Sequence, residues 1–424
     1  MSAGLTGTSP PCRHTARRLA LRWWQAAAAS CLAALAGLAA SPVQSQETSK
    51  FTPFAEETVT TDDNVYRISD QAPPLTQIGY PSRGDTYRTT SFGLTADVPV
   101  SLQRFDATVT YNSYRYDRFH ALDYDGYDLR GSWLWQIGRN LSGEVGMTED
   151  YSLAPFEEVL NAVPDKIHLR EEFAKGSWLV TPDWKLFGAA DDLAQSNSDP
   201  LGQYNNVTVD SFEASLSRAV APGNWLGLDT RLETGHFPVA EPIGTLLVDN
   251  GYTQYGFGVV ADFGSDTPSH VVARVDQVSR HYDQVTVRDF DRTTGRIEYT
   301  WTPTGKTSLS AIAERDISPY EYIHSSIVMV RGITLRPLWH ATQYLDLSAD
   351  LAWLERSYLD DPAEALGAAL PRDDHVQTQS VLLAYTPATW VSVQLSYLHE
   401  TRSSNIPLGG YAADVLWLKA RLSL

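Results

Sequence analysis

The chain has 424 residues, with 33 Lys or Arg against 51 Asp or Glu, so its formal charge is −18. Aromatic residues make up 11% of the chain, which excludes a disordered protein, because disordered chains lack this much aromatic surface. The acidic balance argues against a nucleic-acid partner, since an acidic surface repels phosphate. The two cysteines, Cys12 and Cys31, lie near the start, so a Cys-based zinc or iron–sulfur site is excluded from the rest of the chain.

The N-terminus has the pattern of an export signal. An arginine-rich region, residues 13–22, precedes an apolar run over residues 26–40. The run is shorter than the ~20 residues that a membrane-spanning helix needs, and it matches the apolar region of a signal peptide. We predict a cleaved signal over residues 1–45, and a membrane anchor is the alternative.

After the signal, the recurring pattern is an alternation of apolar and polar residues over about ten positions. It is clearest in four stretches, residues 105–112, 228–233, 296–301 and 345–353. Successive side chains of a strand point to opposite faces, so each stretch has one apolar and one polar face. No later segment has a run of apolar residues long enough for a transmembrane helix. The pattern predicts an all-β chain.

The links between the strand-like segments alternate between short and long. The segments start near residues 52, 86, 102, 126, 140, 167, 184, 205, 224, 250, 269, 292, 306, 323, 343, 375, 389 and 412. Short turns lie at 99–102, 138–140, 181–184, 221–224, 302–305 and 386–389, and long links at 62–84, 117–125, 152–166, 196–204, 236–249, 358–373 and 403–410. Short turns on one side and long loops on the other are typical of bacterial transmembrane barrels.

The last segment alternates to its final residue, with Leu416 and Leu418 on one face and Lys419 and Arg421 on the other. A strand of this kind can close a barrel, and closure is required because an open sheet edge in lipid leaves backbone groups unpaired. We therefore predict one domain, residues 46–424, as a transmembrane antiparallel up-and-down β-barrel of about 18 strands. Residues 46–60 are either the first strand or a periplasmic extension, so 16 strands is the lower alternative.

Tryptophans lie mostly in the predicted strands or next to the short turns. They are Trp133, Trp135, Trp178, Trp184, Trp225, Trp301, Trp339, Trp353, Trp390 and Trp417. Aromatic rings of outer-membrane barrels form girdles at the lipid headgroup level. We predict this position for them, and ordinary core packing is the alternative.

Several stretches after the signal together resemble those of a known protein family. They are Phe-Thr-Pro-Phe at 51–54, Asp62-Asp63-Asn64 with Arg67, residues 85–94, 116–119 with 122–124, 135–138 with 141–143, Arg-Glu-Glu-Phe at 170–173, and Gly-Ser-Trp at 176–178. They resemble the exosortase/PEP-CTERM-associated exopolysaccharide outer-membrane proteins of the EpsL type, best over residues 51–180. The resemblance implies a barrel in the outer membrane of a Gram-negative bacterium that is tied to exopolysaccharide production. It implies no catalytic motif, so no catalytic residue is carried over.

The charged residues that alternation turns toward the lumen are the candidate functional residues. They are Asp106, Asp128, Arg130, Arg170, Glu172, Glu213, Asp229, Arg231, Glu233, Arg274, Asp276, Arg280, Arg296, Glu298, Asp346 and Asp350, with Lys419 and Arg421 in the last strand. Charges on a pore wall set selectivity, and the lumenal rings of Tyr114 and Tyr116 would offer faces to sugars. The alternative is a cross-strand ion-pair network that only stiffens the barrel. Both signs alternate in the strands, so the preferred charge of a solute stays open.

The long loops carry surplus acid. One run consists of Asp360, Asp361, Glu364, Asp373 and Asp374. We interpret it as a solvated outer face. Such loops could bind divalent cations at a lipopolysaccharide surface, but no spacing resembles an EF-hand loop, so we predict no metal site.

A barrel enzyme is a further hypothesis. Barrel hydrolases need a Ser, His or Asp cluster near the rim. His281 and Asp283 could share a face, whereas His399 and Glu400 are adjacent and point to opposite faces. No Gly-x-Ser-x-Gly, His-Glu-x-x-His or phosphate-binding glycine loop occurs. We predict no catalytic residue and no cofactor.

The leading hypothesis is a conduit or porin-like component for exopolysaccharide secretion. Its expected partners are outer-membrane lipid and lipopolysaccharide, the exopolysaccharide itself, and periplasmic or inner-membrane proteins of polysaccharide synthesis and export. A general diffusion porin is the first alternative. An outer-membrane barrel enzyme that modifies lipid or polysaccharide is the second.

Overall fold

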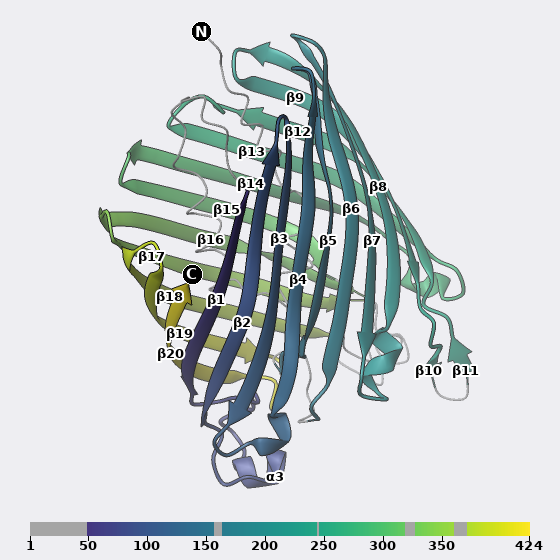
Figure 1. Cartoon of the computed structure of the whole chain (residues 1–424). Helices are drawn as coiled ribbons and strands as arrows, with labels where there is room; N and C mark the ends of the chain where they lie inside the picture. Colours follow the sequence, from purple (N-terminus) through teal and green to yellow (C-terminus); the bar gives the residue numbers. More distant parts are fainter. Residues whose placement is uncertain (1–48, 157–162, 244–245, 319–326, 360–370) are drawn as a thin grey trace.

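The structure is a computed structural model that describes residues 49–156, 163–243, 246–318, 327–359 and 371–424. The predicted signal over residues 1–45 lies outside them. In the described part, 18 strands form one antiparallel sheet (Figure 1). The sheet is closed, because β1 pairs with β2 on one side and with the last strand, β20, on the other. The prediction of an antiparallel up-and-down barrel is confirmed.

Each strand runs antiparallel to its neighbours around the barrel. The strands are β1 (Lys50–Asp62), β2 (Asp85–Val100), β3 (Gln103–Tyr116), β4 (Tyr124–Ile137), β5 (Leu141–Leu153), β6 (Lys166–Thr181), β7 (Trp184–Asn197), β8 (Val207–Ala221), β9 (Asn224–His236), β12 (Tyr252–Phe263), β13 (Ser269–Tyr282), β14 (Phe290–Thr304), β15 (Thr307–Ser318), β16 (Ile327–Thr342), β17 (Leu345–Leu359), β18 (Arg372–Ala388), β19 (Val391–Ser404) and β20 (Tyr411–Ser423). Residues 50–62 form the first strand, so the alternative of 16 strands is wrong.

The two ends of the barrel differ in their connections. Tight turns join the strands at one end, where Ser101, Gly138 and Gly223 adopt positive φ angles. The loops at the other end are longer and contain small elements (Figure 1). These are the helix α3 (Pro74–Ile78), the hairpin β10 (Glu241–Ile243) with β11 (Leu246–Val248), and the 3₁₀ turns η2 (His120–Leu122), η3 (Gly202–Asn205) and η4 (Thr286–Arg288). Both β1 and β20 have their free ends on the tight-turn side, where the Leu424 amide donates to the Pro53 carbonyl at 2.9 Å.

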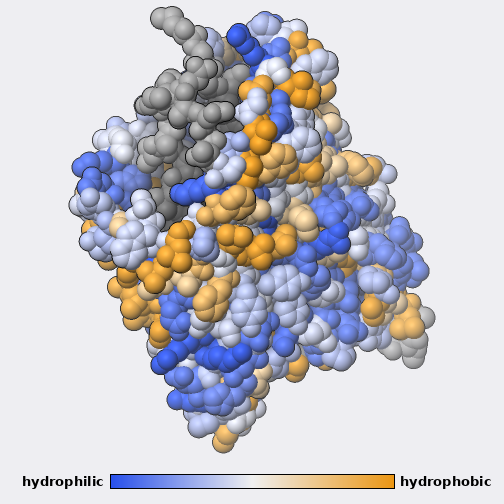
Figure 2. Space-filling model, viewed as in Figure 1, coloured by the Kyte–Doolittle hydropathy of each residue, from blue (hydrophilic) through white to orange (hydrophobic). Residues whose placement is uncertain are grey.

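The strand register assigns every side chain to the outside or the inside, because directly paired residues share a face. Val59 pairs with Leu418, which pairs with Leu395, and all three are exposed apolar residues on the outside. Exposed apolar side chains occur on most strands, and Figure 2 shows patches of them over the strands on the face in view. So large an exposed apolar surface on a closed barrel fits lipid and not water. The chain is a transmembrane barrel of the outer-membrane type.

No helix in the described ranges has the length and apolar character needed to cross a membrane.

Tryptophan positions follow the prediction in part. Trp133 and Phe105 are direct cross-strand partners on the outside, with their rings stacked 6.0 Å apart. Trp225 and Trp417, however, share faces with lumenal residues, and the Lys185 ammonium lies 4.8 Å from the Trp225 ring. These two tryptophans are therefore inside the barrel and not in the headgroup girdle.

One of the familiar sequence stretches has a packing explanation on the outer face. Trp135 of β4 pairs with Gly143 of β5, which pairs with Gly176 of β6. A Cβ atom at Gly143 would overlap the Trp135 ring, and one at Gly176 would lie 3.5 Å from it. The ring therefore lies across two neighbouring strands, and the glycines leave the space that it fills.

We expect Gly143→Ala to destabilise the barrel by about 1–3 kcal/mol, because the added methyl group must displace the Trp135 ring or the β6 backbone. Urea unfolding in detergent, followed by tryptophan fluorescence, measures this loss. Gly131→Ala is the matched control, because a Cβ at that outward position of β4 meets no atom within 4 Å. Equal urea midpoints for the two variants would contradict the packing argument.

Candidate functional site

The inner wall of the barrel carries the predicted charges, with two exceptions. The residues that point inward are Asp106, Asp128, Arg130, Glu213, Asp229, Arg231, Glu233, Arg274, Asp276, Arg280, Arg296, Glu298, Asp346, Asp350, Lys419 and Arg421. They alternate with the exposed apolar residues of the same strands. The strand period of two was sufficient to place them.

Arg170 and Glu172 were predicted to face the lumen, and this prediction is wrong. Arg170 pairs with Glu149 on the outside, and it forms an ion pair with Glu172 there. The inward residue of this stretch is Glu171, which is only 3% exposed. Three consecutive charged residues do not show which of them faces outward. The signal lay further along β6, where the apolar Trp178 is on the same outer face as Arg170 and Glu172.

A buried ion-pair cluster surrounds Arg274 on the inner wall. Its guanidinium lies 3.0 Å from Glu213 and 2.6 Å from Asp276, and it also pairs with Asp229. Arg231 lies 3.5 Å from the same Glu213. Glu213 is on β8 and Arg274 is on β13, with β9 and β12 between them, so the contact is possible only across the concave inner face.

Glycines of β12 make room for this cluster. Gly258 is the direct partner of both Asp229 and Asp276. A Cβ atom at position 258 would overlap the carboxylate of Asp276. The stretch Gly-Phe-Gly at 256–258 therefore places small residues inside and Phe257 in the lipid. Sequence reasoning missed this role, although alternating glycines in a strand signal a close approach of other groups.

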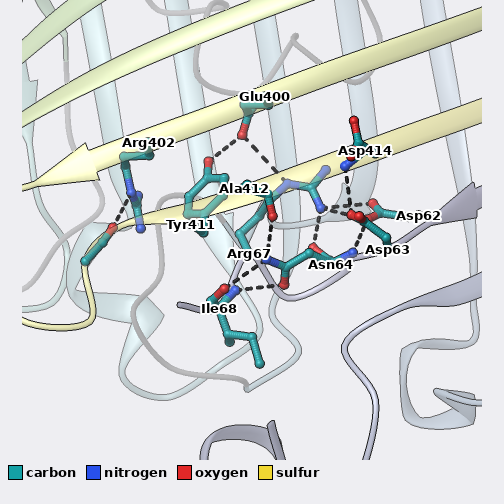
Figure 3. Close-up of polar contacts among 11 residues, drawn as sticks. Asp62, Asp63, Asn64, Arg67, Ile68, Glu400, Arg402, Tyr411, Ala412 and Asp414 are labelled. Atoms are coloured by element: carbon teal, nitrogen blue, oxygen red, sulfur yellow. Dashed lines mark hydrogen bonds and ion pairs between the residues drawn. The ribbon is translucent and has the colours of Figure 1, made fainter. Parts of the chain in front are cut away.

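A second polar network closes the seam of the barrel at the long-loop end (Figure 3). Arg67, in the loop after β1, lies 2.9 Å from Asp62 and 3.7 Å from Glu400 of β19. The hydroxyl of Tyr411 of β20 donates to the same Glu400. The Asn64 amide donates to the Ile68 carbonyl at 2.8 Å and to the Ala412 carbonyl at 2.9 Å. The familiar stretch Asp62-Asp63-Asn64 with Arg67 therefore ties the first long loop to the last two strands.

The stretches 85–94 and 116–124 build the adjoining rim. Asp85 accepts hydrogen bonds from the Arg118 and Phe119 amides at 3.0 and 2.8 Å. Phe119 is fully buried in an apolar core with Tyr66 and Tyr116. Burial raises the pKa of Tyr66, which lies in the loop after β1, to about 12. The long loops are thus fastened to the inner wall by packed side chains at this end.

Tyr114 and Tyr116 do not provide the free sugar-binding faces that we expected. The Tyr114 ring stacks on Tyr124 with 4.4 Å between centroids, and Tyr116 stacks on Tyr87 at 4.6 Å. Both rings use a face for contacts within the protein, because the strands place aromatic residues directly opposite each other.

In the acidic run of the β17–β18 link, one residue is buried on the inner wall and another is exposed. Asp374 is 1% exposed and lies 2.6 Å from Arg372, and it accepts a hydrogen bond from the Tyr358 hydroxyl at 3.0 Å. The prediction of a solvated face is wrong for Asp374, because residue 374 faces inward. Asp373 is exposed. Asp360, Asp361 and Glu364 lie outside the described residues.

The histidine pairs differ from those that the sequence suggested. His281 lies 3.2 Å from Asp289 and not beside Asp283. His399 lies 2.8 Å from Asp414 on the outer face, whereas its neighbour Glu400 points inward to Arg67. Within the described ranges, no group of three or more His, Cys, Asp or Glu residues is placed to hold a metal ion.

The charges of the inner wall are unevenly distributed. On β1–β8, the inward acids are Glu56, Asp62, Asp85, Asp97, Asp106, Asp128, Glu144, Asp150, Glu171, Asp191 and Glu213, and the inward bases are Lys50, Arg104, Arg130, Lys175 and Lys185. The remaining strands contribute the bases Arg231, Arg274, Arg280, Arg292, Arg296, Arg336, Arg356, Arg372, Arg402, Lys419 and Arg421. The half formed by β1–β8 therefore has a surplus of acids, and most of the inward arginines lie on the remaining strands.

Comparison with solved structures finds other barrels at low similarity. OpdO of Pseudomonas aeruginosa has 12% identity and a TM-score of 0.47, with 89% of this chain and 97% of that chain covered. OccK2 (OpdF) of the same organism has 12% identity and a TM-score of 0.47, with 89% of this chain and 98% of that chain covered. The alcaligin receptor FauA of Bordetella pertussis has 12% identity and a TM-score of 0.42, with 91% of this chain and 77% of that chain covered. No protein-family model and no curated protein matches the chain. Similarity at this level assigns no solute.

We expect Arg67→Met to lower the free energy of unfolding by about 3–5 kcal/mol, because it leaves the buried Asp62 carboxylate without its cationic partner. Guanidinium unfolding in detergent, followed by circular dichroism, gives the value. Arg83→Met is the control. Arg83 pairs with Asp70 at the surface, where an ion pair contributes about 0–1 kcal/mol. A loss at Arg67 no larger than that at Arg83 would show that the seam network does not hold the loop.

Proposed function

We propose that the chain is a porin-like channel that lets hydrophilic solutes cross the outer membrane. The observation that carries the proposal is the inner wall, where charged side chains from nearly every strand face one another inside a closed barrel. Barrels of 16–18 strands are wide enough for an aqueous channel. Passage needs only a hydrated wall that binds solutes weakly, so the proposal requires no catalytic residue.

Much of the wall is fixed by ion pairs, and this limits which residues meet a solute. The carboxylates around Arg274 are nearly fully buried, so they stiffen the wall. Asp106 is different, because its side chain is 40% exposed beside Arg104. We infer that the partly exposed charges set selectivity and that the buried cluster holds the shape of the lumen.

The acidic half of the wall suggests the sign of the preference. Acids outnumber bases on the inward faces of β1–β8, and the opposite half has bases to match its own acids. A lumen with a surplus of negative charge raises the local concentration of cations. The channel is therefore expected to favour cations.

The selectivity is measured with the purified barrel in a planar lipid bilayer under a KCl gradient. We expect open-channel currents whose reversal potential shows a preference for K⁺ over Cl⁻. Replacing Asp106 and Asp191 by Asn should reduce this preference, because both carboxylates face the lumen. Glu355→Gln is the control, because Glu355 lies on the outer face. A barrel that carries no current would overturn the channel proposal, and a preference for Cl⁻ would overturn the role of the acidic wall.

Exopolysaccharide is the narrower candidate for the solute. The support for it is the resemblance of residues 51–180 to the exopolysaccharide-associated outer-membrane proteins. The stacked rings of Tyr114 and Tyr116 give it no further support. A conduit of this kind would receive the polymer from a periplasmic and inner-membrane synthesis apparatus.

Deletion of the gene, with polysaccharide assayed separately in the medium, on the cell surface and in the periplasm, tests the narrower candidate. Polymer that is lost outside and retained in the periplasm is the expected result, and the intact gene on a plasmid should restore export. Unchanged export would reject exopolysaccharide as the solute and leave the bilayer result as the test of the general channel.

A further inference from the structure

Two pairs of arginines face each other directly across strands on the outside of the barrel. Arg88 of β2 is the direct partner of Arg115 of β3, and Arg315 of β15 is the direct partner of Arg331 of β16. All four are exposed. Like charges directly opposite each other in a sheet are destabilising, so each pair is a local concentration of positive charge that needs an anion.

The protein supplies only one carboxylate to each pair. Arg115 lies 2.7 Å from Asp125 of β4, and Arg331 forms an ion pair with Glu355 of β17. For Arg88 and Arg315, none of the described residues places a carboxylate within ion-pair distance. Each pair is therefore built alike, with one neutralised arginine beside one arginine whose guanidinium has no carboxylate partner among the described residues.

Both pairs lie near the long-loop end of their strands, just beyond the apolar surface. On the outer face of β2, Arg88 is followed by Phe92, which is 57% exposed, and Leu94, which is 45% exposed. On β16, Arg331 is followed by Ile333, which is 52% exposed. Lipid acyl chains cover this apolar surface, so the arginines lie at the level of the lipid headgroups.

The rim at this level is not basic all round. On the outer faces of β6–β8, three acids, Glu172, Asp192 and Asp210, are consecutive cross-strand partners. The two arginine pairs are therefore local features, separated from this acidic row by the sheet order. A general positive belt around the barrel would not have this pattern.

We propose that Arg88 with Arg115, and Arg315 with Arg331, are binding sites for phosphate groups on the headgroup of an outer-leaflet glycolipid. The planar guanidinium donates two parallel hydrogen bonds to a phosphate. Each pair keeps a net positive charge after its one carboxylate is counted, so it attracts the anion. The apolar residues below each pair contact the acyl chains of the same lipid. The proposal concerns the outside of the barrel and is independent of what passes through the lumen.

The test uses the purified full-length barrel in detergent with diphosphoryl lipid A as the probe. Bound lipid is quantified as phosphorus per barrel after gel filtration. We expect R88Q combined with R315Q to weaken binding at least about tenfold, the effect of losing charge-assisted hydrogen bonds. Arg218→Gln is the matched control, because Arg218 is an exposed arginine on the outside of β8 at the tight-turn end. Its affinity should equal that of the native protein.

A second set of variants tests the same sites in the opposite direction. Asp125→Asn and Glu355→Gln remove the carboxylates that compete with phosphate, so lipid A should bind more tightly. Lipid A without phosphates should bind weakly to every variant. Equal binding of the two lipid A forms, unchanged binding by the arginine variants, or an equal loss in Arg218→Gln would overturn the proposal. Displacement of lipid A by millimolar inorganic phosphate would overturn the assignment to a lipid headgroup.

Discussion

The closure of the sheet is the constraint on which the rest of the structure depends. A backbone N–H or C=O group without a partner in lipid costs several kcal/mol, so the first and last strands must pair. The pairing of β1 with β20 runs from Phe54 with Ser423 to Asp62 with Val415. Beyond the last pair, the seam continues through side chains, because the Asn64 amide donates to the Ala412 carbonyl of β20. The first long loop is therefore held by the same strands that complete the barrel.

The sequence predicted the strands well because a barrel repeats one local rule. Each strand alternates between lipid and lumen, and tight turns alternate with long loops, so strand count and topology follow from short-range patterns. The error at Arg170 and Glu172 arose where three consecutive charges conceal the phase. Partners could not be predicted, because Arg274 and Glu213 are 61 residues apart and meet only through the curvature of the sheet. Tyr116 was read as a free ring for a similar reason, since its partner Tyr87 belongs to another strand.

The stretches near the N-terminus that carry the family resemblance have structural roles. Asp62 and Arg67 form an ion pair at the seam, and Asp85 accepts a hydrogen bond from the Phe119 amide. Gly143 leaves space for the Trp135 ring. These contacts explain why a barrel would need such residues, but they do not point to a solute. A resemblance carried by residues of this kind supports a shared architecture more strongly than a shared substrate. The solute must therefore be sought in the partly exposed charges of the lumen.

Arginine has different surroundings on the two faces of the barrel. On the inner wall, Arg274 has three carboxylate partners, and Arg280 lies 3.7 Å from the Tyr252 ring and near Glu233. These cations are compensated by the protein, as burial requires. On the outer rim, Arg88 and Arg315 face a second arginine. In water such an arrangement costs little, because solvent screens the charges. Next to an apolar surface covered by lipid, screening is weaker, and the anionic headgroups of that lipid are the nearest source of compensating charge.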